Sequence, residues 1–179
     1  MAPVPPPGPV PPSAAPPPSA MADRLDRAGE YDAVFAVVRA AVWKRLHRER
    51  SGLGLGLARL PAQLGGYWPV TGNMIVLNES LVDSVRAHLG SQREVNGFLF
   101  VLLAHEYIHT LGYLDEPSTR RLTAEVARDA LGADHPAARL ASGDLWQMLP
   151  FLRDAPFDGA SHLRIVSGFD RAATATYIR

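Results

Sequence analysis

The sequence predicts an α+β fold in a single domain, with one buried central helix, further amphipathic helices and a small sheet. Three observations lead to this prediction. The chain has 179 residues, which is the size of one ordinary domain. The stretch from Val95 to Leu103 is apolar on every side, as is typical of a helix buried in the core. Residues 52–57 alternate glycine with leucine, and this period of two is typical of a strand.

Residues 1–22 are expected to form a disordered, proline-rich tail, and residues 23–179 the folded domain. Ten of the 16 prolines fall within the first 18 residues, and the first charged residue is Asp23. Such a segment has too few large apolar side chains to offset the entropy that is lost when the chain becomes ordered. The remaining residues, about 150 of them, are enough for one hydrophobic core.

The domain is expected to open with a helix and a strand. Between Tyr31 and Arg50 the apolar residues recur with the helical period. One face of this helix gathers Phe35, Val38, Val42 and Leu46. In the strand at residues 52–57, the glycine face allows a neighbouring backbone to approach closely.

A loop, a second strand and a second helix are expected next. The loop covers residues 61–72, where glycine and proline are frequent. Residues 74–77 form a short apolar run that predicts a strand. The helix begins at Asn78 or Ser80, either of which can cap it, and runs to His88.

The buried helix and a helix that follows it dominate the second half of the domain. The buried helix begins at residue 91 or 92 and ends at Gly112. A helix over residues 117–131 follows, and Asp115 or Glu116 is placed to cap it. Because the connection is short, the two helices are expected to form an antiparallel pair. Weaker patterns predict a helical turn at residues 136–142 and strands at residues 162–166 and 174–178.

The most informative motif, His105-Glu106-Tyr107-Ile108-His109, lies at the end of the buried helix. Residues four apart share one helix face, so both imidazoles can reach one metal ion. Two neutral nitrogen donors suit zinc, which lowers the pKa of a bound water to about 7. Glu106 lies about 100° round the helix from His105, where it can contact that water without being a ligand. The motif therefore predicts Zn²⁺ as cofactor and Glu106 as general base.

The composition excludes several classes of function. The 18 basic and 18 acidic residues give a formal net charge of zero, whereas nucleic-acid and membrane-surface binders usually carry a basic excess. No apolar run approaches the length of a transmembrane helix. Because the chain has no cysteine, disulfides, thiolate zinc sites and cysteine nucleophiles are excluded. We expect a cytoplasmic protein with neither a nucleic-acid nor a membrane partner.

The stretch from Asn96 to Leu131, with its His105-Glu106-x-x-His109 motif, resembles the active-site region of the zincin metallopeptidases. The resemblance implies a zincin-like domain that hydrolyses a peptide or protein substrate through a zinc-activated water. It also implies an edge strand that pairs with extended substrate. Residues 52–57 or 74–77 are candidates for this strand, although either can equally be a core strand.

Two branches of this family place the third zinc ligand differently. In the snapalysin-like metzincins the motif continues to a glycine and then to a liganding aspartate, and Gly112 and Asp115 stand at these places. That branch also has a methionine turn beneath the metal, for which Met148 is a candidate. The alternative interpretations are that Asp115 caps a helix and that Met148 fills the core.

In the thermolysin-like gluzincins the third ligand is a glutamate on the following helix, and an aspartate four residues later orients a liganding histidine. Glu125 and Asp129 match this pattern. We favour Glu125 as ligand, because a helix begins directly after Asp115 and gives that residue a capping role. Asp129 is then expected to orient a liganding histidine and fix its tautomer. His135 is a third choice of ligand.

Other roles are left open by the sequence. An oxyanion donor is needed, and the sequence does not choose among Tyr113, His135, His162 and Tyr177. One alternative function is a non-catalytic zinc-binding scaffold, although such a site needs no general base. Another is a metal-dependent RNA hydrolase, because His105-x-x-x-His109-x-x-Gly112-Tyr113 resembles the rRNA-maturation metallohydrolases. Asp115 stands where that family has its third histidine.

Overall fold

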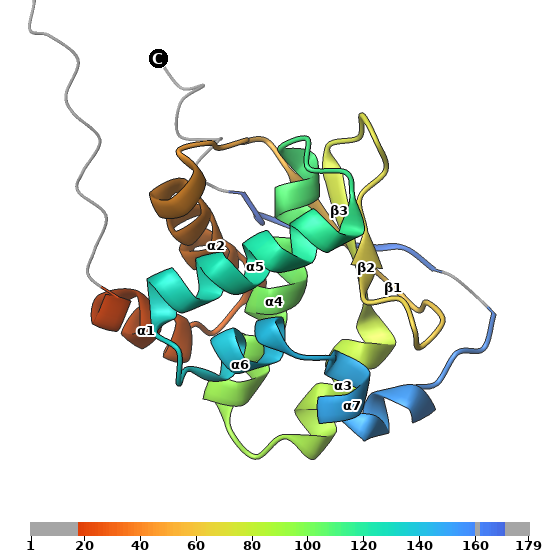
Figure 1. The fold of residues 1–179 in the computed structure, drawn as a ribbon. Coiled ribbons are helices and arrows are strands. Elements are labelled where there is room, and N and C mark those ends of the chain that lie inside the picture. The colour runs from red at the N-terminus through yellow and green to blue at the C-terminus, as the bar shows by residue number, and fades with distance from the viewer. Residues whose placement is uncertain (1–17, 160–161, 171–179) are drawn as a thin grey trace, which may run out of the picture.

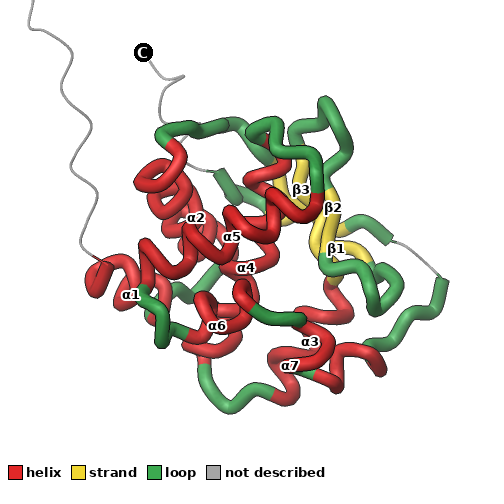
Figure 2. Tube along the Cα trace, viewed as in Figure 1, coloured by secondary structure: helices red, strands yellow, loops and turns green. Residues whose placement is uncertain are grey.

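The computed structural model describes residues 18–159 and 162–170, which form an α+β domain, as the sequence predicted. Helices make up most of it, and the strands gather at one side (Figure 2). The helices are α1 (Pro18–Asp26), α2 (Tyr31–Leu46), α3 (Glu79–His88), α4 (Gln92–Thr110), α5 (Glu116–Leu131), α6 (Pro136–Ser142), α7 (Leu145–Met148) and the 3-10 helix η1 (Pro150–Asp154). The strands are β1 (Gly54–Ala58), β2 (Gly66–Tyr67), β3 (Met74–Asn78) and β4 (Arg164–Val166).

The sheet is mixed, with the strand order β2-β3-β1-β4. β1 and β3 pair in parallel, with Leu55 opposite Ile75. β4 is antiparallel to β1, and β2 is antiparallel to β3. Residues 52–57 and 74–77 therefore contribute the two interior strands, and neither provides the edge strand that the family resemblance implied. The edges are β2, which lies within the expected loop, and β4.

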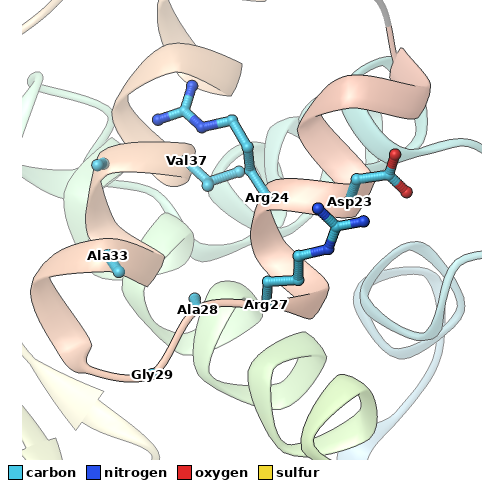
Figure 3. Close-up of a pocket in the computed structure, with 8 residues that line it drawn as sticks. Asp23, Arg24, Arg27, Ala28, Gly29, Ala33 and Val37 are labelled. Atoms are coloured by element: carbon cyan, nitrogen blue, oxygen red, sulfur yellow. The ribbon is translucent and has the colours of Figure 1, made fainter.

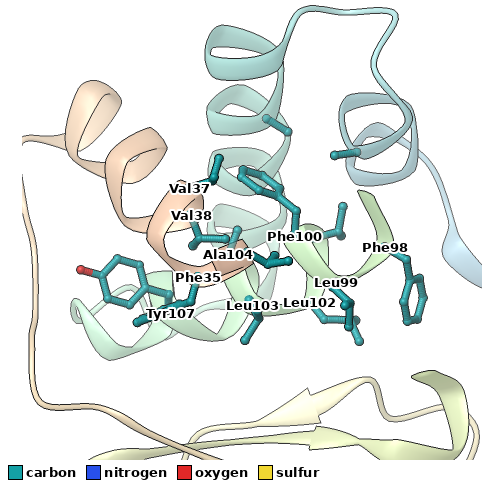
Figure 4. Packing of buried hydrophobic residues seen from close by; sticks show 14 of the residues in the cluster. Phe35, Val37, Val38, Phe98, Leu99, Phe100, Leu102, Leu103, Ala104 and Tyr107 are labelled. Carbon is teal, nitrogen blue, oxygen red and sulfur yellow. The ribbon is translucent and has the colours of Figure 1, made fainter. Parts of the chain in front are cut away.

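α4 lies at the centre of the domain, between the sheet and the helices α2, α5 and α6 (Figures 1 and 4). Its side chains Phe98, Phe100, Leu103 and Tyr107 are fully buried, which confirms the prediction of a helix buried on all sides. Tyr107 packs edge-on against Phe35 of α2 and exchanges hydrogen bonds with the backbone N–H and carbonyl of Arg50. Every side of α4 is therefore fixed by packing, and this makes it a rigid support for its last two turns.

The folded region begins earlier in the chain than the sequence suggested. α1 starts at Pro18, so residues 18–22, which were expected to belong to the tail, are part of the domain. Met21 and Leu25 of this helix are completely buried. The buried amide of Asn96 on α4 donates hydrogen bonds to the carbonyls of Leu25 and Ala28. Burial of these apolar side chains and the satisfied amide offset the entropy of ordering this segment.

Asn78 organises the loop that leads into β2. Its side chain caps α3 by accepting a hydrogen bond from the backbone N–H of Ser80. The amide group of the same side chain donates to the carbonyls of Leu60, Pro61 and Leu64, at distances between 2.9 and 3.1 Å. Because Asn78 is fully buried, these bonds hold residues 60–64 in one conformation beside the sheet.

The remaining elements differ from the sequence prediction mainly in detail. The helices α2, α3, α5 and α6 lie within about two residues of the expected ranges, except that α2 stops at Leu46. α7 and η1 were not predicted, and the strand expected at residues 174–178 lies outside the described residues. Within residues 18–159 and 162–170, no helix is both long enough and apolar enough to cross a membrane.

Candidate metal centre

The turn after α4 determines which side chains meet at the histidines. α4 ends at Thr110, and Gly112 follows with a φ of 98°, a conformation that glycine adopts without strain. Asp115 is the N-cap of α5, and its carboxylate accepts a hydrogen bond of 2.9 Å from the backbone N–H of Ser118. Glu116 is thereby the first residue of α5, and its side chain lies against the two histidines of the motif.

Three donor atoms converge at this place. The Nε2 atoms of His105 and His109 are 3.2 Å apart. One carboxylate oxygen of Glu116 lies 3.1 Å from Nε2 of His109, and the other lies 3.3 Å from Nε2 of His105. Ligands about 2.0 to 2.1 Å from a tetrahedral zinc ion lie about 3.3 Å from one another. The two imidazole nitrogens have this spacing, and the two distances to Glu116 belong to different oxygens. With one donor atom from each side chain, the three atoms lie within 4.8 Å of one another.

The state of the two imidazoles fits metal binding. The Nδ1–H of His109 donates a hydrogen bond of 2.7 Å to the carbonyl of Tyr113, which leaves a lone pair on Nε2. Burial lowers the pKa of His105, so this ring is neutral at neutral pH. The Nε2 atoms of the two rings and the Glu116 carboxylate lie so close together that they share a proton or a cation.

Glu106 lies beside this group but does not belong to it. Its side chain is only 7% exposed, and no described residue donates a hydrogen bond to its carboxylate. Burial, with a smaller contribution from the Glu116 carboxylate, raises the pKa of Glu106 to about 8. Gly66 of β2 runs close by: a Cβ at that position would lie 3.5 Å from Cγ of Glu106 and 2.6 Å from the carbonyl oxygen of Val76. The glycine allows β2 to lie against both β3 and this carboxylate.

A groove of about 670 Å³ opens onto the site, and His105, Glu106 and Glu116 line it. Residues 63–66 of the β2 segment, α5 and residues 140–146 form its other walls. A zinc site that binds and activates small molecules has three protein ligands and one open position, whereas a structural site is closed by a fourth ligand. The described part of the chain brings only this one group of three potential ligands together, and the group is accessible from the groove.

The expected ligand Glu125 and its expected partner Asp129 lie elsewhere. Glu125 forms ion pairs with Arg45 of α2 at 2.8 Å and with Arg121 at 2.9 Å. Asp129 is half exposed and lies 3.3 Å from the same Arg45. Nine residues turn an α-helix through about 900°, so Glu125 points away from the side on which Glu116 lies. α5 also crosses α4 instead of running alongside it (Figures 1 and 4).

The other ligand candidates have structural roles in the described residues. Asp115 caps α5, as its alternative interpretation held. His135 is buried; its Nδ1 accepts a hydrogen bond from the N–H of Ala137, and its Nε2 lies 3.0 Å from a carboxylate oxygen of Asp26. Both nitrogens of this ring are therefore occupied. Met148 is 43% exposed on α7, so it neither fills the core nor lines the groove.

None of the side chains considered as oxyanion donors lines the groove. Tyr113 packs under the guanidinium of Arg48, and His162 is exposed. Tyr177 lies outside the described residues. Arg120, which the sequence analysis did not consider, lines the groove and lies 3.6 Å from the Glu116 carboxylate. It is the cationic donor nearest to the three potential ligands among the residues that line the groove.

A second hollow, of about 330 Å³, lies between α1 and α2 (Figure 3). Asp23, Arg24 and Arg27 line it together with small apolar side chains. It contains neither a histidine nor a converging group of carboxylates. The metal-ligating chemistry of the described residues is therefore confined to the first groove.

The chain was also compared with family models, with curated proteins and with solved structures, and nothing matches in any of the three comparisons. The function therefore has to be inferred from the site itself.

Proposed function

We propose that this protein is a zinc-dependent metallopeptidase in which His105, His109 and Glu116 hold the metal and Glu106 is the general base. The observation that carries the proposal is the convergence of one donor atom from each of these three side chains, all within 4.8 Å of one another, at an open groove. This ligand set corrects the prediction from sequence, because Glu116 replaces Glu125. Two histidines and one glutamate are a donor set found in zinc peptidases.

Zinc in this site would supply a Lewis acid that polarises a substrate carbonyl and makes a water more acidic. The protein side chains supply the remaining chemistry. Without a metal the pKa of Glu106 is about 8, and the charge of a bound zinc ion would lower it so that the carboxylate is ionised. Glu106 then takes the proton from the attacking water and passes it to the departing amine nitrogen. Its burial and its lack of protein hydrogen-bond donors leave both carboxylate oxygens free for this transfer. Arg120 is the group in the groove best placed to donate a hydrogen bond to the developing oxyanion.

The edge strand β2 supports a peptide as substrate. β2 pairs with β3 on one side only in the described residues, and Gly65 and Gly66 line the groove. An extended peptide can add to such an edge through main-chain hydrogen bonds. Because Gly66 lies next to Glu106, a peptide bound along β2 passes the general base.

The experiment that tests the proposal compares the wild type with Glu106→Gln and with Glu49→Gln. Each protein is loaded with zinc, assayed for zinc by elemental analysis, and tested on a library of peptides with a mixed sequence. Glu49 is an exposed glutamate outside the groove, so its variant controls for the loss of one carboxylate. We expect about one zinc per chain in all three proteins, hydrolysis by the wild type and Glu49→Gln, and at least about a 100-fold loss of rate in Glu106→Gln.

Two results would contradict the proposal. Zinc binding without hydrolysis of any peptide by the wild type would identify a zinc-binding scaffold. Cleavage of an RNA oligonucleotide but of no peptide would identify the RNA hydrolase alternative.

A further inference from the structure

Three arginines of α5, Arg120, Arg121 and Arg128, line the groove beside the candidate metal centre. They lie on the same wall as Glu116 and Ala124. Residues 116, 120, 124 and 128 are four apart and so form one inclined row along the helix. The row begins at Glu116, the proposed metal ligand, and its other charged members, Arg120 and Arg128, are positive.

One arginine of this wall, Arg128, has no carboxylate partner among the described residues. Arg128 is exposed, and its guanidinium forms no hydrogen bond or ion pair within the described part of the chain. Arg120 has Glu116 as its carboxylate partner, and Arg121 shares Glu125 with Arg45. Asp144, on another wall of the groove, already accepts hydrogen bonds from the backbone N–H groups of Trp146 and Gln147. Three arginines and three carboxylates, those of Glu106, Glu116 and Asp144, line the groove, and Arg128 is the positive charge among them without a partner in the described residues.

The rest of the groove favours a peptide over a nucleic acid as the anionic occupant. Five apolar side chains line it: Val101 and Leu102 of α4, and Leu140, Leu145 and Trp146. Residues 65 and 66 add strand backbone that can pair with an extended peptide. Apolar walls and strand pairing suit amino-acid side chains and peptide backbone, whereas a phosphodiester chain needs a continuous basic surface.

We infer that the groove selects peptides with acidic side chains, and that Arg128 and Arg120 bind their carboxylates. This inference rests on the proposed function and names its substrate class. Arg120 lies about 6 Å along α5 from Glu116, and Arg128 about 12 Å beyond Arg120. An extended peptide advances about 3.3 Å per residue, so these steps correspond to about two and about four residues. Acidic side chains at such spacings lie on one face of the peptide.

The test measures binding, so that it does not depend on hydrolysis. The zinc-loaded Glu106→Gln protein is titrated into a fluorescent peptide with glutamate at every second position, and into a matched peptide with glutamine at the same places. Anisotropy gives the two affinities. We expect the glutamate peptide to bind at least about tenfold more tightly at low salt.

Arginine variants locate the effect. In the same background, Arg128→Gln reduces the preference for glutamate by about threefold, and Arg120→Gln reduces it further when both are combined. Arg153→Gln is the matched control, because Arg153 is also an exposed arginine without a partner among the described residues but lies outside the groove. We expect the Arg153→Gln variant to keep the preference for the glutamate peptide that the parent protein has.

The outcomes separate this inference from the proposed function. Equal affinity for the two peptides, or an equal effect of Arg153→Gln, overturns the inference even if the wild type hydrolyses peptides. A single-stranded oligonucleotide that displaces the glutamate peptide at lower concentration than the unlabelled peptide itself also overturns it. A clear preference for glutamate in a protein that binds no zinc supports the inference and removes the proposed hydrolysis.

Discussion

The helix α5 carries two pairs of acidic residues, Asp115–Glu116 at its start and Glu125–Asp129 in its later turns, and the two pairs have different surroundings. At the start, Glu116 lies within 3.3 Å of two imidazole nitrogens in a groove. Further along, Glu125 and Asp129 lie on Arg45 at the surface. Arg45 pairs with both carboxylates of the later pair, whereas the Glu116 carboxylate lies against two imidazole nitrogens, with Arg120 3.6 Å away.

The proposed zinc site therefore depends more on which carboxylate lies against the histidines than on the place of a carboxylate in a sequence pattern. Glu125 has the spacing of a known ligand, but two guanidinium groups occupy its oxygens. Glu116 has an unusual spacing, seven residues after His109, and the turn at Gly112 brings it to the histidines. A cation between His105, His109 and Glu116 would reduce the repulsion between the atoms that meet there. Glu116 would therefore gain more from a bound metal than Glu125, whose charge is already paired.

The largest expected effect is on zinc affinity. Glu116→Gln weakens zinc binding by more than about 100-fold, because it removes a charged ligand, whereas Glu125→Gln leaves the affinity unchanged. Competition with a chromophoric chelator at fixed pH measures both affinities. The two variants are matched, since each changes one glutamate of the same helix to its amide.

The reverse result would restore the ligand predicted from sequence. If Glu125→Gln loses zinc and Glu116→Gln keeps it, α5 must rotate and slide relative to α4 when the metal binds. Loss of zinc in both variants would indicate that the ion pairs of Arg45 support the site at a distance.

The residues of the site that the sequence predicted all lie on one helix. His105, Glu106 and His109 occupy neighbouring turns of α4, so helical geometry alone relates them, and the apolar flank shows that the helix is buried. Glu116 belongs to the next helix. Its position depends on the left-handed conformation of Gly112 and on the angle at which α5 crosses α4, and neither can be derived from residue spacing.

The same distinction applies to the fold. Long periodic elements such as α2 and α5 were predicted, and so were the apolar interior strands. β2 has two residues, Gly66 and Tyr67, and shows no period, so its role as the edge strand at the groove was missed. α1 was missed in part because it begins among prolines, and only its packing against Asn96 and the core shows that it is ordered.

The contact between His135 and Asp26 extends this comparison to a histidine that has a structural role. Burial is the largest cause that lowers the pKa of His135; Arg93 and Arg139 also lower it, and Asp26 opposes them. The neutral ring accepts a hydrogen bond from Ala137 and so caps α6. His135→Ala removes the cap and leaves Asp26 without this partner, which costs about 1 to 3 kcal/mol of unfolding free energy.

The pH dependence of unfolding provides a second measure of His135. Its pKa is lower in the folded state than in the unfolded state, so the unfolded chain binds the proton more readily. The contribution of His135 is complete above the unfolded pKa of about 6.5 and is lost as the pH falls from there through the folded pKa. We expect the wild type to lose more thermal stability than His135→Ala when the pH falls from about 7.5 to about 5.5. This range is centred on the pKa of the unfolded ring, about 6.5. Parallel curves for the two proteins would show that folding leaves the pKa of this ring unchanged.

A smaller effect is expected at Asp115, the neighbour of Glu116. Asp115→Ala removes the acceptor for the Ser118 N–H at the start of α5 and lowers the melting temperature by about 2 to 4 °C. Asp115→Asn keeps an oxygen for the cap and lowers it less. Both variants retain zinc, because capping and not ligation is the role of this residue. Loss of zinc in Asp115→Asn with an unchanged melting temperature would make Asp115 a ligand.

The smallest effect is expected at the later acidic pair. Glu125 and its partners Arg45 and Arg121 are partly exposed, with 25 to 62% of each side chain accessible, so solvent and salt screen their ion pairs. Glu125→Gln should lower the melting temperature by less than about 2 °C at low salt, and the difference should vanish near 1 M salt. Arg121 lines the groove and loses its carboxylate partner in this variant. The variant should therefore bind the glutamate peptide slightly more tightly. A large, salt-independent destabilisation would instead mean that this pair fixes α5 on α2, and with it the position of Glu116.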